Sequence, residues 1–221
     1  MSYNIAIDGP AGAGKSTIAK KIAAKMNFIY VDTGAMYRAM ALHMIRSQVD
    51  PSDADKISET CQSADITIRY EDGEQVVYLN GENVNGLIRT EAVGNMASVS
   101  SVNPDVRKKL VELQQKLAGT ADVVMDGRDI GTCVLPNANV KVYLTASTAV
   151  RARRRYDELT VKGENCDLKQ IEADIEERDH RDMTRELSPL RQAEDAVLLD
   201  SSDMTIDEVV DAVIQMCGRK E

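Results

Sequence analysis

A glycine-rich segment near the start of the chain has the residue types needed to hold phosphate groups. It comprises Gly9-Pro10-Ala11-Gly12-Ala13-Gly14-Lys15-Ser16-Thr17 and matches the pattern G-x-x-x-x-G-K-[ST]. Its small residues let backbone N–H groups turn inward around a phosphate, and a following helix N-terminus adds partial positive charge. Lys15 would contact the β- and γ-phosphates, and the Ser16 hydroxyl would ligate Mg²⁺. The segment predicts a site for the phosphates of a nucleotide.

Arginines form two clusters in the second half of the chain. The clusters comprise Arg151, Arg153, Arg154 and Arg155, and then Arg178, Arg181, Arg185 and Arg191. Arg178, Asp182 and Arg185 are spaced to lie on one helix face, which could clamp a phosphate and hold a ribose hydroxyl. From the spacing alone, a solvated face braced by ion pairs is the favoured interpretation. The first cluster has the same two interpretations, as a lid over a phosphoryl group or as a solvated face.

A third group of charged residues lies at the carboxyl end of a predicted buried strand at 121–129. Asp126 and Asp129 lie where that strand ends, which is the edge at which open parallel sheets bind ligands. The two carboxylates could merely pair with Arg128. Their place opposite a phosphate loop favours a role at the metal or the substrate. His43 and His180 have neither metal-ligand spacing nor a nucleophile motif.

The elements that must position these residues alternate between strand and helix. Short strands are predicted at 5–8, 28–31, 121–129, 140–144 and 197–200, with helical patterns between most of them. Thr33 is the expected N-cap of a helix that ends near Arg46 and buries Ile45, and Ile206 is expected to begin the buried stripe of a terminal helix. Residues 65–85 instead show the alternation and turns of a small antiparallel meander. The expected fold is α/β, a P-loop parallel sheet flanked by helices with this meander as an insert.

Composition limits the possible partners and compartments. The 221 residues, 43% of them hydrophobic, suffice for one substantial core, and the formal net charge of −9 argues against a nucleic-acid polymer or an anionic membrane as partner. The four cysteines are far apart, so neither a zinc site nor a disulfide framework is indicated and a reducing cytoplasm is expected. We expect no targeting segment and no membrane span.

Five segments in a fixed order make the chain resemble a known family. They are residues 8–17, Asp32-Thr33-Gly34-Ala35-Met36-Tyr37-Arg38, Asp126-Gly127-Arg128-Asp129-Ile130-Gly131-Thr132, Arg151-Ala152-Arg153-Arg154-Arg155, and Arg178-Asp179-His180-Arg181-Asp182-Met183-Thr184-Arg185. With the meander between the second and the third, the chain resembles the bacterial cytidylate kinases of the nucleoside monophosphate kinase family. The resemblance implies transfer of the γ-phosphoryl group of ATP to CMP or dCMP, with Mg²⁺, in pyrimidine nucleotide metabolism. It also implies one P-loop kinase domain over 1–221, with a nucleotide-monophosphate lobe at about 35–118 and a lid at about 151–166.

The resemblance also implies roles for individual residues. Those at the acceptor phosphate are Arg38, Arg128 and Arg185; those at the ribose are Arg178 and Asp182; those reading cytosine are Ser98, Arg107 and Asp129; and the lid arginines near ATP are Arg151, Arg154 and Arg155. Lys15, Arg128, Arg154 and Arg185 are the expected catalytic residues. Thr33 stands where some members have Ser, and its retained hydroxyl is expected at the substrate.

Two other functions remain as alternatives at this point. A P-loop GTPase switch would require a guanine-reading N-K-x-D segment, which the sequence lacks. A kinase of another small acceptor, such as shikimate, is disfavoured only through the family resemblance. The preference between CMP and dCMP and the tolerance of UMP stay open, and a monomer that binds only small nucleotides is expected.

Overall fold

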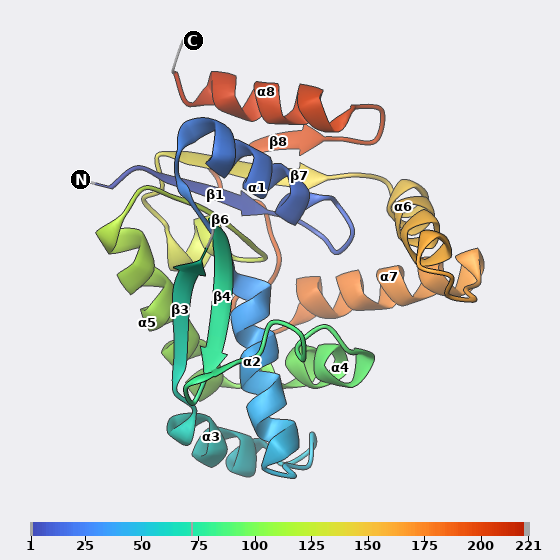
Figure 1. Cartoon of the computed structure of the whole chain (residues 1–221). Coiled ribbons are helices and arrows are strands. Elements are labelled where there is room, and N and C mark those ends of the chain that lie inside the picture. The colour runs from blue at the N-terminus through green and yellow to red at the C-terminus, as the bar shows by residue number, and fades with distance from the viewer. Residues whose placement is uncertain (1, 72, 219–221) are drawn as a thin grey trace. The chain divides into compact units, whose positions relative to one another are not determined.

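The chain divides into two compact units. The computed structural model describes residues 2–71 and 73–218, coloured along the chain in Figure 1. The first unit comprises Met1–Ile29 and Ala121–Glu221, and the second comprises Tyr30–Thr120. The first unit therefore contains the P-loop segment and both arginine clusters, and the second contains the meander.

A parallel sheet forms the centre of the first unit, with the strand order β6-β1-β7-β8 (Figure 1). Its strands are β1 (Asn4–Asp8), β6 (Val123–Gly127), β7 (Val140–Thr145) and β8 (Val197–Asp200), and β2 (Ile29–Asp32) runs from the last residue of the first segment of this unit into the second unit. The β1 strand pairs in parallel with both β6 and β7, and β7 pairs in parallel with β8. Ile5, Ala6 and Ile7 are fully buried, as expected for a central strand covered on both faces. The predicted α/β fold with a parallel sheet is confirmed.

Helices of the first unit pack on this sheet and on each other. The helices are α1 (Lys15–Met26), α6 (Thr148–Val161), α7 (Leu168–Thr184) and α8 (Ile206–Met216), and a π-helical turn, η1 (Ile130–Val134), follows β6. The α1 helix packs on β1 and β6, α8 packs on α1, and α6 packs on α7. Thr205 and Glu208 form the capping box that starts α8. Every helix in the described ranges is too short or too polar to cross a membrane.

The second unit is arranged around α2 (Thr33–Arg46). Its other elements are α3 (Ala54–Ser63), β3 (Ile66–Glu71), β4 (Glu74–Leu79), β5 (Glu82–Asn83), α4 (Glu91–Ser100) and α5 (Pro104–Thr120). The three strands form the predicted antiparallel meander, in which Ile68 is opposite Val77. Met36, Met40 and Met44, four residues apart on α2, are fully buried because α2 contacts all the larger elements of this unit. The meander is confirmed.

Two local predictions about helix ends are wrong. Asp32, not Thr33, caps α2, because its carboxylate accepts the N–H of Ala35 at 2.8 Å and Thr33 is already helical. Ile45 and Ile206 are 39% and 48% exposed and do not join the core. Ile45 comes nine residues after Met36, about half a turn round the helix, so it faces away from the buried methionines, and Ile206 is the first residue of α8, before its buried Val209, Val210 and Val213.

Candidate active site

The P-loop joins β1 to α1 in the strand, loop and helix context that its motif requires. Gly14 is left-handed, with φ of 86°, and Lys15 begins α1. Lys15 is only 6% exposed, and its ammonium group donates to the carbonyl of Pro10 at 2.7 Å. At Gly9, with φ of 149°, an added Cβ would lie 1.9 Å from the carbonyl oxygen of Leu144 on β7. The loop is thus held close against the sheet, with its lysine folded back over it.

A hydroxyl and a carboxylate meet beside the P-loop. The Ser16 hydroxyl donates to Oδ2 of Asp126 at 3.0 Å, and Asp126 is buried near the carboxyl end of β6. Hard oxygen ligands of this kind suit Mg²⁺, which usually takes one or two protein ligands and completes its shell with substrate phosphates and water. Within residues 2–71 and 73–218, no group of three His, Cys, Asp or Glu side chains could form a protein-only metal cage. The residues present therefore fit a nucleotide-bound Mg²⁺.

Burial changes the proton affinity of two groups around the loop. Desolvation, with a smaller contribution from the Arg128 charge, lowers the pKa of Lys15 from 10.5 to about 7. Burial raises the pKa of Asp8, at the end of β1, to about 6. It does so although the Asp8 carboxylate accepts the N–H groups of Ile130 and Gly131, each at 2.7 Å. Both groups therefore titrate near neutral pH when no nucleotide neutralises the site.

The lowered pKa of Lys15 predicts proton uptake when a triphosphate binds. Above pH 7 the free protein holds Lys15 mostly as the neutral amine, and nearby phosphate charges would raise its pKa and restore the ammonium form. At pH 8 binding of a non-hydrolysable ATP analogue should therefore take up roughly one proton, and affinity should fall as pH rises further. Calorimetric titration in two buffers of different ionisation enthalpy measures the uptake. The same uptake by Lys15→Met would contradict this assignment.

The structure brings together the predicted acceptor residues of the first unit. Nε of Arg128 donates to Oδ2 of Asp182 at 2.8 Å, while Arg185 lies 3.6 Å from Asp129 and 3.9 Å from Asp182. Arg178 is close enough for its charge to act on both Lys15 and Asp182. Burial by itself would raise the pKa of Asp182, but the Arg128 charge and hydrogen bond hold this pKa below its usual range. The cluster combines guanidinium groups with two carboxylates beside the P-loop lysine.

The three predicted lid arginines have different environments. Arg151 is buried, and its Nη1 donates to the carbonyl of Ala11 in the P-loop at 2.9 Å. Nη2 of Arg154 donates to the carbonyl of Ser201 at 2.7 Å, just after β8. Arg155 pairs with Glu158 on its own helix at 2.9 Å. Direct contact of these arginines with ATP stays a prediction.

The predicted substrate residues of the second unit lie on α2, α4 and α5. Arg38 pairs with Asp32 at 3.2 Å, and Arg107 stacks over the ring of Tyr37, with 5.7 Å between the guanidinium carbon and the ring centroid. Thr33 is buried at the start of α2, and Ser98 is half-buried on α4. Asp32 thus both caps α2 and orients an arginine of this helix.

Sequence reasoning missed several residues that hold these groups in place. Asp32 also accepts from Arg89 at 3.1 Å, Asp8 fixes the start of η1, and Asp179 pairs with Arg151 at 2.6 Å. Asp8, Asp32 and Asp179 all lie within the five segments that resemble the family, and this was the one feature of the sequence that could have indicated a role for them. Their partners are distant in sequence, and spacing alone could not identify them.

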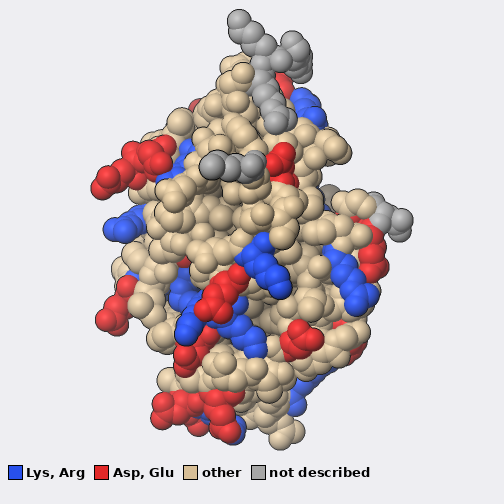
Figure 2. Space-filling model, turned by 90° about the vertical axis from the view of Figure 1, so that its left-hand side faces the viewer, with Lys and Arg blue, Asp and Glu red and all other residues tan. Residues whose placement is uncertain are grey.

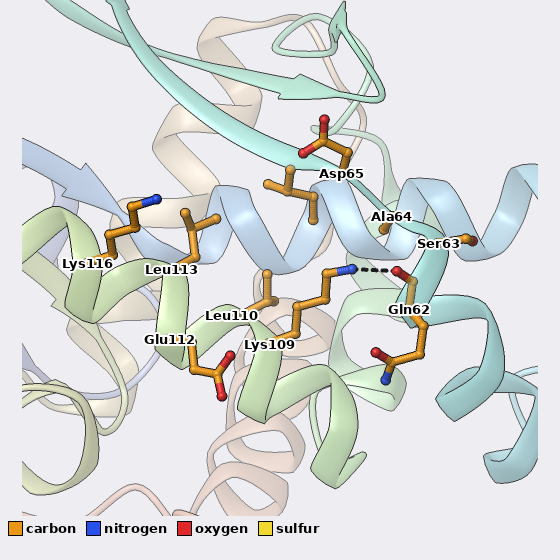
Figure 3. Close-up of a pocket in the computed structure, with 10 residues that line it drawn as sticks. Gln62, Ser63, Ala64, Asp65, Lys109, Leu110, Glu112, Leu113 and Lys116 are labelled. Atoms are coloured by element: carbon orange, nitrogen blue, oxygen red, sulfur yellow. Dashed lines mark hydrogen bonds between the residues drawn. The ribbon is translucent and has the colours of Figure 1, made fainter.

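A hollow in the second unit lies apart from all these residues. It has a volume of about 490 Å³ and lies beside the end of α3 and the middle of α5, with Ala64 and Leu113 in its wall (Figure 3). The Lys109 ammonium group donates there to the carbonyls of Cys61 and Gln62, at 2.9 and 2.8 Å. None of the predicted site residues lines the hollow, so it is separate from the predicted nucleotide site.

Charged side chains of both signs lie on one face of the protein. Figure 2 shows Lys and Arg side chains lying among Asp and Glu side chains on that face.

The comparison with known protein families agrees with the geometry of the P-loop and the arginine cluster. A family model described as cytidylate kinase matches residues 5–219. The chain belongs to the cytidylate kinase family. It is 50% identical over 213 residues to a cytidylate kinase of Caldicellulosiruptor bescii, covering 96% of this chain and 94% of that protein. It is 47% identical over 221 residues to a cytidylate kinase of Lactiplantibacillus plantarum, covering 100% and 97% of the two chains.

Solved structures of more distant proteins share the fold. A gluconokinase from Sinorhizobium meliloti aligns with a TM-score of 0.52 at 13% identity, covering 98% of this chain and 92% of that chain. A shikimate kinase from Bacteroides thetaiotaomicron aligns with a TM-score of 0.50 at 12% identity, covering 98% and 99%. At such low identity these likenesses support a kinase-type P-loop fold and say nothing about the acceptor. The family predicted from the five segments is confirmed by the sequence relatives.

Proposed function

We propose that this protein transfers the γ-phosphoryl group of ATP to CMP or dCMP, giving ADP and CDP or dCDP. The observation that carries the proposal is membership of the cytidylate kinase family over nearly the whole chain. The P-loop with its buried lysine and the adjacent arginine cluster supply the positive charge that phosphoryl transfer requires. An oxygen of the acceptor phosphate attacks the γ-phosphorus, the bond from that phosphorus to the β-phosphate oxygen breaks, and ADP leaves.

The donor is assigned to the P-loop. The backbone N–H groups of residues 9–17 would surround the β- and γ-phosphates, and Lys15 would neutralise charge on them in the transition state. Ser16, with Asp126 beside it, would hold Mg²⁺, which supplies electrostatic stabilisation of the phosphate oxygens when bound. Arg151, Arg154 and Arg155 remain assigned to the ATP side of the lid.

The acceptor is assigned to arginines of both units. Arg38, Arg128 and Arg185 would hold the CMP phosphate, and Arg178 and Asp182 would bind the ribose. Two-pronged guanidinium contacts give a phosphate both affinity and a fixed direction, which in-line transfer requires. The pairing of Arg128 with Asp182 and the contact of Arg185 with Asp129 pre-orient two of these arginines. Thr33 contributes a hydroxyl to the same substrate.

Base selection is assigned to Ser98, Arg107 and Asp129, and Asp129→Asn tests it. Cytosine presents an amino donor beside two acceptors, whereas uracil reverses the pattern at two positions, so a carboxylate acceptor should favour CMP. A site that hydrogen-bonds its substrate can reject a mismatch by factors of about 10⁴, so the variant should lose most of its preference for CMP over UMP. Steady-state kcat/KM for both nucleotides measures this. An equal loss for CMP and UMP would assign Asp129 only to holding Arg185.

The domain organisation carries a further prediction. We assign residues 1–221 to one P-loop kinase domain, with the nucleotide-monophosphate lobe at about 35–118 and the lid at about 151–166, and we expect a monomer in the cytoplasm. Transfer without ATP hydrolysis requires that water be excluded, so the lid should close over bound nucleotides. Lys162, exposed between α6 and α7, is a trypsin site. Cleavage there should slow when CMP and a non-hydrolysable ATP analogue bind together, and unchanged cleavage would contradict closure.

One assay separates the proposed activity from its alternatives. ADP release, coupled to a reporter reaction, is measured with ATP, Mg²⁺ and each of five acceptors: CMP, dCMP, UMP, AMP and shikimate. The proposal expects the highest kcat/KM with CMP or dCMP and little release without an acceptor. Preferential use of shikimate, or ADP release independent of any acceptor, would overturn it.

A further inference from the structure

One residue of the P-loop, Ala11, has both of its backbone polar groups bound by a single ion pair. The carbonyl of Ala11 accepts from Nη1 of Arg151 at 2.9 Å, and the N–H of Ala11 donates to Oδ1 of Asp179 at 3.3 Å. Arg151 lies on α6 and Asp179 on α7, and their side chains meet with 2.6 Å between Nη1 and Oδ2. Two helices of the first unit therefore hydrogen-bond to the start of the P-loop, α6 through a guanidinium group and α7 through a carboxylate.

This contact differs from the other ion pairs of α6. The side chains of Arg151 and Asp179 are 5% and 11% exposed, whereas those of Arg153 and Asp157, four residues apart on α6, are 64% and 55% exposed. An exposed pair contributes little, and a buried pair has a desolvation cost that its attraction often fails to exceed. Stability is therefore a weak reason to keep charges at positions 151 and 179.

The remaining donors of Arg151 are also used within the protein. Nε donates to the carbonyl of Ala146 at 2.9 Å, and Nη2 donates to the hydroxyl of Thr148 at 3.1 Å. Nη1 makes two further contacts, with the Ala11 carbonyl and with Asp179, so oxygens of the protein accept from four of the five N–H groups of Arg151. A Cβ at Gly12, the next P-loop residue, would lie 3.3 Å from Cβ of Arg151. Arg151 is thus built into the outer wall of the loop and is not extended toward a phosphate.

We propose that Arg151 and Asp179 are positioning residues that set the shape of the P-loop for the phosphates of ATP. The inference rests on the proposed kinase function and changes the role expected for Arg151 from direct contact to indirect support. A glycine-rich loop has many backbone conformations, and only those with N–H groups directed inward can bind phosphate. Fixing the N–H and the C=O of Ala11 restrains the two peptide groups that flank this residue, which excludes conformations in which either rotates, so the binding geometry exists before ATP arrives.

If Asp179 acts only through its charge, Asp179→Asn should change the affinity for ATP in one direction; if Asp179 positions the loop, the affinity should change in the opposite direction. The substitution removes a negative charge near the P-loop, so Coulomb repulsion of the phosphates would fall and ATP would bind more tightly. If the carboxylate instead fixes the loop, Asn cannot accept from both the Ala11 N–H and Nη1 of Arg151, because one of its two terminal atoms is an NH₂ donor, so one of these contacts is lost and ATP would bind more weakly. The direction of the change in affinity therefore distinguishes the two roles.

The experiment measures the affinity of the full-length protein for AMP-PNP with Mg²⁺ by calorimetry. Wild-type turnover of CMP is checked first, so that a failure of the proposed function is recognised separately. We expect Asp179→Asn to raise the Kd by about 10- to 100-fold while KM for CMP changes little. Asp157→Asn, which breaks the exposed pair on α6, is the matched control and should leave both values unchanged. Tighter or unchanged binding by Asp179→Asn would overturn the proposal.

A double variant and a measurement on the wild type exclude a merely structural role. Arg151→Met with Asp179→Leu replaces the buried pair by apolar groups, which often preserves or raises stability. We expect its Tm to recover toward wild type while AMP-PNP binding stays weak; recovery of both would overturn the proposal. In the wild type, the Ala11 amide should stay protected from hydrogen exchange when AMP-PNP binds, and loss of protection would overturn the proposal even if neither variant folds.

Discussion

Replacing Lys15 by Ala should lower kcat by about 10²- to 10³-fold while the protein stays folded, because one electrostatic contact to the transferring phosphates is lost. The ammonium group is buried and donates to the Pro10 carbonyl, so it lies within the loop that the phosphates would enter. The loss should affect kcat more than KM for CMP, since charge on the β- and γ-phosphates changes most in the transition state. Steady-state kinetics with both substrates measures this.

Two controls separate the charge of Lys15 from its volume. Lys15→Met keeps the apolar stem and should lose as much activity as Lys15→Ala. The Tm of Lys15→Met should not fall below that of the wild type, because desolvation lowers the pKa of Lys15 to about 7, so burying its charged form destabilises the folded protein at neutral pH and a neutral side chain removes this effect. Near-normal turnover by a folded Lys15→Met protein would remove Lys15 from the catalytic group.

The second large effect is expected for Arg185→Ala, which should lower kcat/KM for CMP by about 10²- to 10³-fold. Its guanidinium group is nearly buried, close to Asp129 and Asp182, and its Nε donates to the carbonyl of Ser188 at 2.7 Å. A group fixed in this way would hold the acceptor phosphate with little entropy loss. Binding of AMP-PNP, measured directly, should change by less than about twofold, because the loss falls on the acceptor.

Arg181→Ala is the matched control for this experiment. Arg181 lies one helical turn earlier on α7, is half-exposed, and comes within only 3.8 Å of Glu177. Its removal should leave both substrates unaffected, whereas Arg185→Ala also leaves two carboxylates with less compensation and should lower Tm. If Arg185→Ala lost affinity for AMP-PNP while its kinetics with CMP stayed unchanged, the assignment of Arg185 to the acceptor phosphate would be wrong.

The sequence was sufficient to predict the order and type of the main elements, because the chemistry-bearing segments follow strand ends directly. Asp126 follows a run of apolar residues, and the P-loop joins a strand to a helix, so both had to lie at one edge of a parallel sheet. The meander was equally clear from its alternation and turns. Such features depend on neighbours in the chain, which the sequence displays.

Features that depend on distant partners could not be predicted. The π-helical turn at 130–134 is fixed by the Asp8 carboxylate, more than 120 residues away, and no helical period marks it. The burial of Arg151 depends on Asp179 and Ala11, so its basic run resembled the solvated face that Arg153 and Arg155 do form. The prediction of the N-cap of α2 was wrong for a related reason. Asp32 and Thr33 are both good N-cap residues, and contacts in the folded protein decide which of them caps the helix.

The close approach of Gly9 to β7 also limits how this site can evolve. The atom that a side chain at position 9 would strike is the carbonyl oxygen of Leu144, which belongs to the backbone and is present whatever residue occupies position 144. A smaller side chain at 144 therefore makes no room, and no compensating substitution at the point of collision can rescue a change at Gly9. Under selection for activity, variants at position 9 should regain function by reversion and not through second-site suppressors on β7.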